Sequence, residues 1–235
     1  MKAIILAGGF GTRLQSVLRD VPKPMAPIAG RPFLAYLLRH LQAQGVDHVI
    51  LSVHYRAEQI QHYFGTHFNG MTLEYVMEAT PLGTGGAMRL ALSSFRTNEP
   101  VFVLNGDTFV ALDYRQMYAK HAAENSQLTF ALCDMADCTR YGKVVIDDQH
   151  IVAFTEKGEV GRGRINAGVY LIQSDLFANY DMPALFSFES DFIYPNLQKL
   201  KPHYYLSAGY FIDIGVPEDY QRAQTELLAG EAGIV

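Results

Sequence analysis

KAIILAGGFGTRL, residues 2–14, joins an apolar run to a glycine-rich turn. The run at residues 2–7 predicts a buried strand, and Gly8 and Gly9 predict a tight turn at its end. Glycines after a strand allow backbone N–H groups to approach a phosphate, although a plain tight turn needs the same residues. The run is too short for a signal peptide and is soon followed by Arg13, so we expect a cytoplasmic protein.

Strand-like and helical segments alternate after this turn. Residues 10–31 read as a long loop, residues 48–53, 72–77 and 100–105 as strands, and residues 32–44, 56–64 and 84–95 as helices. This alternation predicts an open α/β sheet with helices on both faces, in which ligands bind outside the carboxyl ends of the strands. Three glycine-rich or acidic turns follow such ends, at residues 8–13, 83–86 and 106–107.

The second half of the chain is richer in strands. Strand-like runs occupy residues 127–133, 142–147, 150–155, 164–172 and 204–213, and helical patterns occupy residues 188–200 and 217–229. Few long helices separate the first four of these runs, which predicts that they form an antiparallel extension of the sheet. We expect one domain over residues 1–235, with lobes at about 1–110 and 111–235.

Composition and charge exclude several classes of protein. Hydrophobic residues make up 49% and charged residues 18%, which excludes a disordered chain, and no apolar run is long enough to span a membrane. The net charge of −5 argues against a general nucleic-acid binder. Residues 1–31 nevertheless hold five basic residues against Asp20, which favours a local anionic ligand. Cys133 and Cys138 are too few for a four-ligand zinc site, so we read them as reduced structural thiols.

Two cations and two aspartates suggest a phosphate site with a metal ion. Arg13 and Lys23 lie on the proline-containing loop and suit a triphosphate, unless they are plain surface charges. Asp107 follows an apolar strand, where it either holds Mg²⁺ or caps a turn. Asp213 interrupts an apolar run, so it is either a second Mg²⁺ ligand or a buried, hydrogen-bonded residue.

A second set of polar residues occurs in the strand-rich half. Lys157 follows a strand and could neutralise a further phosphate, while Glu156 and Asn166 could bind sugar hydroxyls. The alternative is an ordinary solvated surface.

These motifs together resemble the sugar-1-phosphate nucleotidyltransferase family over essentially the whole chain. The resemblance rests on GGFGTRL at residues 8–14, PKP at 22–24, PLGTGGA at 81–87, EKG at 156–158 and FIDIGVPEDY at 211–220. It implies a Rossmann-like three-layer α/β/α sandwich with a mixed, mainly parallel central sheet. It also implies transfer of a nucleotidyl group to a sugar 1-phosphate with release of pyrophosphate.

The resemblance assigns a role to each motif. It implies a nucleotide-binding lobe at about residues 1–110 and a sugar-phosphate-binding lobe at about 111–235. The catalytic residues would be Arg13, Lys23 and Asp107, with Mg²⁺ held by Asp107 and Asp213. The nucleotide would contact Leu6, Ala7, Gly8, Gly9, Gly11, Thr12, Glu78, Gly83, Thr84 and Gly85, and the sugar phosphate would contact Gly142, Glu156, Lys157 and Asn166.

Within the family, residues 16–34 and 211–220 look most like the D-glycero-α-D-manno-heptose 1-phosphate guanylyltransferase branch. That branch implies Mg²⁺-dependent transfer of GMP from GTP to the heptose phosphate, for surface polysaccharide synthesis. The alternatives are a mannose-1-phosphate guanylyltransferase, a uridylyltransferase acting on an amino-sugar phosphate, and a non-catalytic nucleotide-sugar-binding module. We expect neither nucleic acid nor a membrane as partner, and the choice between monomer and homodimer stays open.

Overall fold

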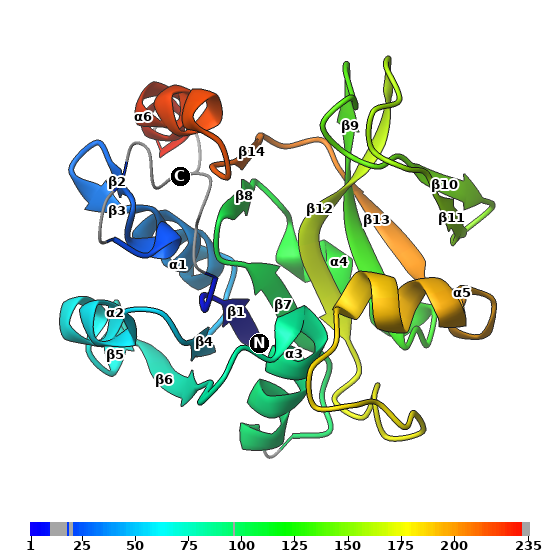
Figure 1. The fold of residues 1–235 in the computed structure, drawn as a ribbon, viewed down its shortest axis with the longest axis horizontal. Coiled ribbons are helices and arrows are strands. Elements are labelled where there is room, and N and C mark those ends of the chain that lie inside the picture. The colour runs from blue at the N-terminus through cyan, green and yellow to red at the C-terminus, as the bar shows by residue number, and fades with distance from the viewer. Residues whose placement is uncertain (10–17, 19–20, 96, 232–235) are drawn as a thin grey trace.

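A mixed ten-stranded sheet forms the centre of the computed structural model, which describes residues 1–9, 18, 21–95 and 97–231 (Figure 1). In spatial order its strands are β10 (Val144–Asp147), β11 (His150–Phe154), β13 (His203–Ser207), β9 (Leu128–Met135), β12 (Gly163–Ile172), β7 (Val101–Asn105), β1 (Lys2–Leu6), β4 (His48–Val53), β6 (Met71–Met77) and β5 (His67–Phe68).

The direction of the strands changes across this sheet. β1 pairs in parallel with β4 and β7, and β4 pairs in parallel with β6, so these four strands end at one edge. β12 then runs antiparallel to both β7 and β9, which confirms the predicted antiparallel extension. β13, for which the sequence predicted a strand without a direction, pairs in parallel with β9.

Helices cover both faces of the sheet, because successive strand residues point to opposite sides. On β1, Ala3 and Ile5 belong to one buried cluster and Ile4 belongs to the other. The first cluster includes α1 (Phe33–Ala43), α2 (Ala57–Phe64), α4 (Tyr114–Ala123) and α6 (Pro217–Glu231), and the second includes α3 (Gly83–Ser94), a π-helix (Phe188–Ile193) and α5 (Tyr194–Leu200). The predicted three-layer sandwich is confirmed. None of the helices in the described part of the chain is both long and apolar enough to cross a membrane.

Several segments differ from their predicted form. Residues 204–213 form two strands, because the chain leaves the central sheet after β13 and β14 (Phe211–Asp213) pairs antiparallel with β8 (Thr108–Val110) in a separate sheet. Gly209 allows this exit, since a Cβ there would lie 2.0 Å from the carbonyl oxygen of Ala111. The predicted helix at residues 188–200 is a π-helix followed by α5. No helix was predicted where α4 lies.

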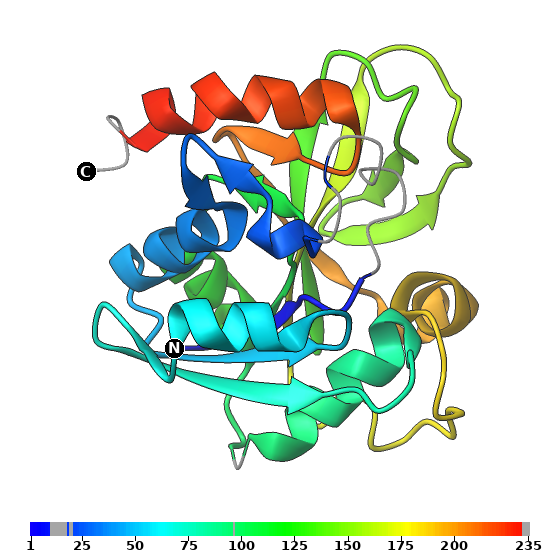
Figure 2. The ribbon, with the colours of Figure 1, turned by 60° about the vertical axis from the view of Figure 1, so that its left-hand side comes forward.

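The described end of the predicted loop at residues 10–31 also has structure. A 3₁₀ turn at Lys23–Met25 leads into a short hairpin of β2 (Pro27–Ile28) and β3 (Arg31–Pro32). α6 packs against β2 and β14, as Figure 2 shows. The 3₁₀ turn itself packs against α1 and α2, and Nζ of Lys23 reaches Asp107, two residues after the end of β7.

Candidate active site

The turn after β1 forms the floor of a pocket. Gly8 has no room for a side chain, because a Cβ would lie 2.7 Å from Oε1 of Glu78 and 3.3 Å from Cβ of His54. A Cβ on Gly9 would meet no atom of the described residues within 4 Å. Leu6, Ala7, Gly8 and Gly9, four of the residues that the resemblance assigns to the nucleotide, all line this pocket. The predicted site residues Gly11, Thr12 and Arg13 lie outside the described residues.

Glu78 is a buried carboxylate in the wall of the same pocket. It follows β6, is 7% exposed, and accepts hydrogen bonds from the Ser52 hydroxyl at 3.1 Å and the Leu82 backbone N–H at 3.1 Å. Its described partners are therefore neutral donors, one on each oxygen. Each carboxylate oxygen can accept a further bond, so the group can receive N–H donors from a ligand.

The glycines that open α3 are explained chiefly by packing. A Cβ on Gly85 would lie 2.1 Å from the Phe186 ring, and the Gly85 N–H donates to the Phe186 carbonyl at 3.0 Å. Gly83 and Thr84 line the same pocket as Gly8 and Glu78, whereas Gly85 faces Phe186 instead. The Thr84 hydroxyl accepts a hydrogen bond from the Phe188 N–H at 2.9 Å, which ties this turn to the π-helix.

Lys23, Asp107 and Asp213 converge although they are far apart in the chain. Lys23 Nζ lies 2.8 Å from Oδ2 of Asp107. Asp213 stands opposite Thr108 in the β14–β8 pair, and the N–H of Ile214 donates to the Asp107 carbonyl at 3.0 Å. Burial raises the pKa of Asp213, and the negative charge of Asp107 raises this pKa further. The site thus has two repelling carboxylates whose charge Lys23 partly offsets.

These carboxylates fit a magnesium ion that is completed by substrate. No group of three or more His, Cys, Asp or Glu side chains within the described ranges could hold a metal by itself. Mg²⁺ is commonly bound through one or two carboxylates together with substrate phosphates, so two aspartates suffice.

A second pocket adjoins the first and contains the predicted sugar-phosphate residues. Asn105 lines both pockets, while Asp107 lines the first and Asp213 the second. A Cβ on Gly168 would lie 2.7 Å from Nδ2 of Asn105, so this glycine lets the amide sit between the pockets. The second pocket brings together Gly142, Glu156, Lys157 and Asn166, and it also contains Thr108, Tyr141, Glu189, Tyr194 and Phe211, which were not predicted.

Asn166 is held by the protein in this second pocket. Its amide nitrogen donates to the Tyr170 hydroxyl at 2.8 Å and to Oε1 of Glu189 at 2.5 Å. Its carbonyl oxygen accepts from the Gly168 N–H at 3.0 Å, and the register of β12 shifts between Asn166 and Tyr170. Bulges of this kind occur often beside active sites. Glu189 comes from the π-helix, a rare element that is also frequent at functional sites.

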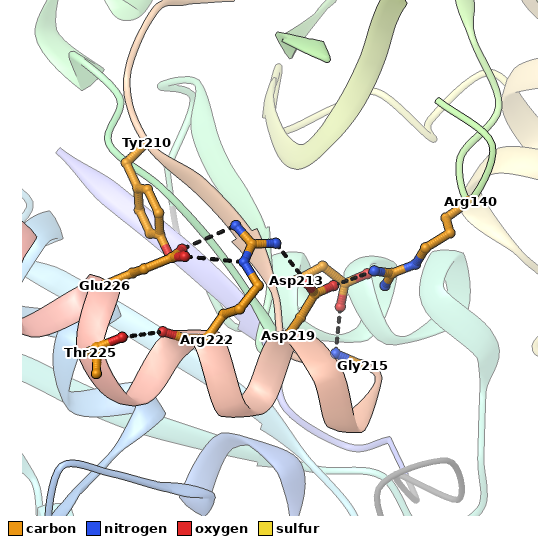
Figure 3. Close-up of polar contacts among 8 residues, drawn as sticks. All are labelled: Arg140, Tyr210, Asp213, Gly215, Asp219, Arg222, Thr225 and Glu226. Carbon is orange, nitrogen blue, oxygen red and sulfur yellow. Dashed lines mark hydrogen bonds and ion pairs between the residues drawn. The ribbon is translucent and has the colours of Figure 1, made fainter. Parts of the chain in front are cut away.

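A charged network lies beside Asp213 at the start of α6 (Figure 3). Asp219 is buried at 4% exposure and forms ion pairs with Arg140 at 2.5 Å and Arg222 at 2.8 Å. Arg222 also binds Glu226, which accepts a hydrogen bond from the Tyr210 hydroxyl at 2.8 Å. The Gly215 N–H donates to Oδ1 of Asp213 at 2.7 Å, so the chain from Asp213 into α6 is closely held.

Comparisons with known proteins agree with this arrangement. The family model of the nucleotidyl transferases matches residues 2–230. Over 227 residues, 97% of this chain and 98% of the relative, the sequence is 45% identical to the D-glycero-alpha-D-manno-heptose 1-phosphate guanylyltransferase of Aneurinibacillus thermoaerophilus. The enzyme of that name from Campylobacter jejuni is 46% identical over 221 residues, which are 94% of this chain and 97% of the relative.

A solved structure extends the likeness to three dimensions. HddC from Yersinia pseudotuberculosis, complexed with GMP-PN, matches with a TM-score of 0.84 and 39% identity, covering 95% of this chain and 97% of that one. Together with the family match along nearly the full length, this shows that the chain belongs to the nucleotidyl transferase family.

Proposed function

We propose that the protein transfers GMP from GTP to D-glycero-α-D-manno-heptose 1-phosphate, forming GDP-heptose and pyrophosphate. The observation that carries this proposal is the pair of adjoining pockets, which meet at Asn105 and place Asp107 in one and Asp213 in the other. Such an arrangement suits two phosphorylated substrates, one in each pocket, that react where the two pockets meet. The full-length similarity to two heptose 1-phosphate guanylyltransferases supports the choice of substrates.

The chemistry requires alignment of two anions rather than a strong base. A phosphate oxygen of the sugar 1-phosphate attacks the α-phosphorus of GTP, a new P–O bond forms, and the bond to the leaving pyrophosphate breaks. A sugar phosphate is already ionised near pH 7, so no side chain has to remove a proton. The rate enhancement then comes from positioning and from stabilisation of the developing charge.

Asp107 and Asp213 would hold Mg²⁺, which neutralises and orients phosphate oxygens when bound. Lys23, paired with Asp107 at 2.8 Å, would contact the triphosphate of the nucleotide. By the family resemblance, Arg13 would stabilise the leaving pyrophosphate. Lys157 lies on the exposed loop between β11 and β12, where its charge would bind the phosphate of the sugar.

Glu78 would select guanine. The N1–H and N2–H groups of guanine are two adjacent donors, and Glu78 offers two carboxylate oxygens whose described protein partners are neutral. A base that lacks these donors would leave a buried carboxylate without ligand partners, which discriminates strongly. This supports GTP over UTP, because the Watson–Crick edge of uracil offers one N–H donor between two carbonyl acceptors.

Glu189 and Glu156 would bind the sugar. Oε1 of Glu189 accepts from Asn166 and also from the Tyr170 hydroxyl at 2.9 Å, and the carboxylate lies in the wall of the sugar pocket. Because Asn166 is engaged by Tyr170, Gly168 and Glu189, we assign it to orienting the wall, with Glu189 as an acceptor for sugar hydroxyls. The proposal includes a cytoplasmic location, which the two buried free cysteines support.

A substrate matrix tests the function. The purified protein is incubated with each of four nucleoside triphosphates and with heptose, mannose, glucose and N-acetylated sugar 1-phosphates, and pyrophosphate release is measured. We expect the highest kcat/KM for GTP with the heptose phosphate. A higher value with mannose 1-phosphate or with UTP and an amino-sugar phosphate would replace the proposed substrates. Absence of pyrophosphate release with every pair would instead indicate a binding module.

A further inference from the structure

Asp219 connects two parts of the molecule that are distant in sequence. Its two carboxylate oxygens bind different arginines: Oδ1 pairs with Arg222 at 2.8 Å and Oδ2 with Arg140 at 2.5 Å (Figure 3). Arg222 lies three residues further along α6, so its contact is local to the helix. Arg140 comes from the loop between β9 and β10, so its contact joins that loop to α6.

The loop that carries Arg140 is part of the sugar pocket. The next two residues, Tyr141 and Gly142, line that pocket. The Tyr141 N–H donates to the Cys138 carbonyl at 2.7 Å, which closes a turn around Arg140. The Gly158 N–H donates to the carbonyl of Thr139 at 3.0 Å, so the loop with Glu156 and Lys157 is tied to the same turn.

Asp219, the α6 partner in the ion pair, lies close in the chain to Asp213, the proposed metal ligand. Asp213 precedes α6 by four residues, and its carboxylate is fixed by the Gly215 N–H. The rings of Tyr141 and Phe211 also meet, with centroids 5.9 Å apart. Arg140 and Asp219 therefore connect the wall that carries the sugar-phosphate residues to the segment that carries Asp213.

We propose that Arg140 is a positioning residue that, through Asp219, sets the sugar-phosphate loop relative to Asp213. The inference rests on the proposed function, because the alignment concerns the sugar phosphate and the α-phosphate of the nucleotide. Arg140 acts through Tyr141, Gly142 and the turn at Gly158. The described residues that line the nucleotide pocket come from other segments, so we expect GTP binding to be independent of the pair.

The two arginines provide a matched test. Arg140→Ala and Arg222→Ala each remove one partner of Asp219 and leave the other, so both variants keep the buried carboxylate paired. We expect Arg140→Ala to lower kcat/KM for the sugar 1-phosphate by roughly ten- to a hundredfold, since small misplacements of reacting groups have effects of that size. GTP affinity, measured by calorimetry without the sugar phosphate, stays as in wild type. Arg222→Ala keeps the wild-type kcat/KM and the wild-type GTP affinity. Arg140→Lys recovers part of the kcat/KM that Arg140→Ala loses.

Amide hydrogen exchange tests the link between the Arg140 loop and α6 without measuring catalysis. Exchange at residues 138–142 and 156–158 rises in Arg140→Ala and stays as in wild type in Arg222→Ala, because a local opening depends on the contacts that tie the segment down. Equal kinetic losses in the two alanine variants, or a matching loss of GTP affinity in Arg140→Ala, would overturn the proposal. If the wild-type protein is inactive with every substrate pair, the proposed function is refuted. The difference in hydrogen exchange between the two alanine variants then tests by itself whether Arg140 couples the loop to α6.

Discussion

The substitution Asp107→Asn tests whether Asp107 binds the metal ion or mainly stabilises the fold. The substitution preserves the shape of the side chain and removes the negative charge that faces Lys23 and Asp213. The lost ion pair is 2.8 Å long, with side chains 16% and 30% exposed, so it lies between a surface and a buried pair. The substitution also relieves the repulsion that raises the pKa of Asp213. We expect the free energy of unfolding to change by about 1 kcal/mol or less, or about 2–4 °C in melting temperature.

The expected loss of activity is much larger. Removal of one of two metal carboxylates should lower kcat at least about a hundredfold, which corresponds to about 2.7 kcal/mol of transition-state stabilisation. Magnesium binding should show the same change. An ion at about 100 times its Kd stabilises the native state by about 2.7 kcal/mol, or roughly 5–11 °C for a chain of this size. In the presence of GTP, wild type gains this shift on addition of Mg²⁺, and Asp107→Asn loses most of it.

The measurements are the rate of pyrophosphate release and the melting temperature with GTP, with and without Mg²⁺. Asp175→Asn is the matched control, because Asp175 is an exposed aspartate in a turn and its neutralisation should change neither quantity. Wild-type turnover of Asp107→Asn at limiting Mg²⁺, with an unchanged magnesium shift, would refute the metal assignment. Unfolding at the assay temperature would assign the loss of activity to the fold.

Three further substitutions test other parts of the site. Glu78→Gln should lower kcat/KM for GTP about tenfold or more relative to ATP and UTP, because charged acceptors for the guanine N–H groups are lost; an equal loss with all nucleotides would point to the Leu82 turn instead. Lys157→Ala should raise KM for the sugar 1-phosphate about 10- to 150-fold, as for a charged hydrogen bond worth about 1.5–3 kcal/mol, and a rise in KM for GTP alone would contradict its assignment. Gly85→Ala places a Cβ 2.1 Å from the Phe186 ring. It should cost about 1–3 kcal/mol in denaturant unfolding, with Gly9→Ala, whose Cβ would meet no described atom within 4 Å, as the control.

Local patterns predicted the layers of the fold well. The apolar runs that become β1, β4 and β7 are short and bounded by polar residues, proline or glycine, so their ends follow from the chain itself. The helix predicted from Pro32 begins one residue later, at Phe33, because Pro32 occupies the N-cap. α4 was missed because its apolar pattern is weak: its buried residues Tyr114, Met117 and His121 have helical spacing, but one of them is a histidine and the segment is largely polar.

The candidate site was predicted in part. The positions of Gly8 and Asp107 follow from the rule that strands of an open α/β sheet present ligands at their carboxyl ends. Their chemistry came from the resemblance to a family. Glu189 and Tyr141 were missed because a single polar residue in a loop, or in a π-helix, has no periodic signal in the chain.

Hydrophobic periodicity and glycine punctuation are local, so KAIILAGG and the segments that follow it were enough to indicate a layered α/β protein with a phosphate-binding edge. Contacts between distant segments needed the folded chain. The pairing of β14 with β8 brings Asp213 beside Asp107, the Lys23 ammonium binds Asp107 across 84 positions, and Asp219 binds Arg140 across 79 positions. Each of these depends on strand register and side-chain packing between segments, and neither quantity is encoded in the spacing of residues along one segment.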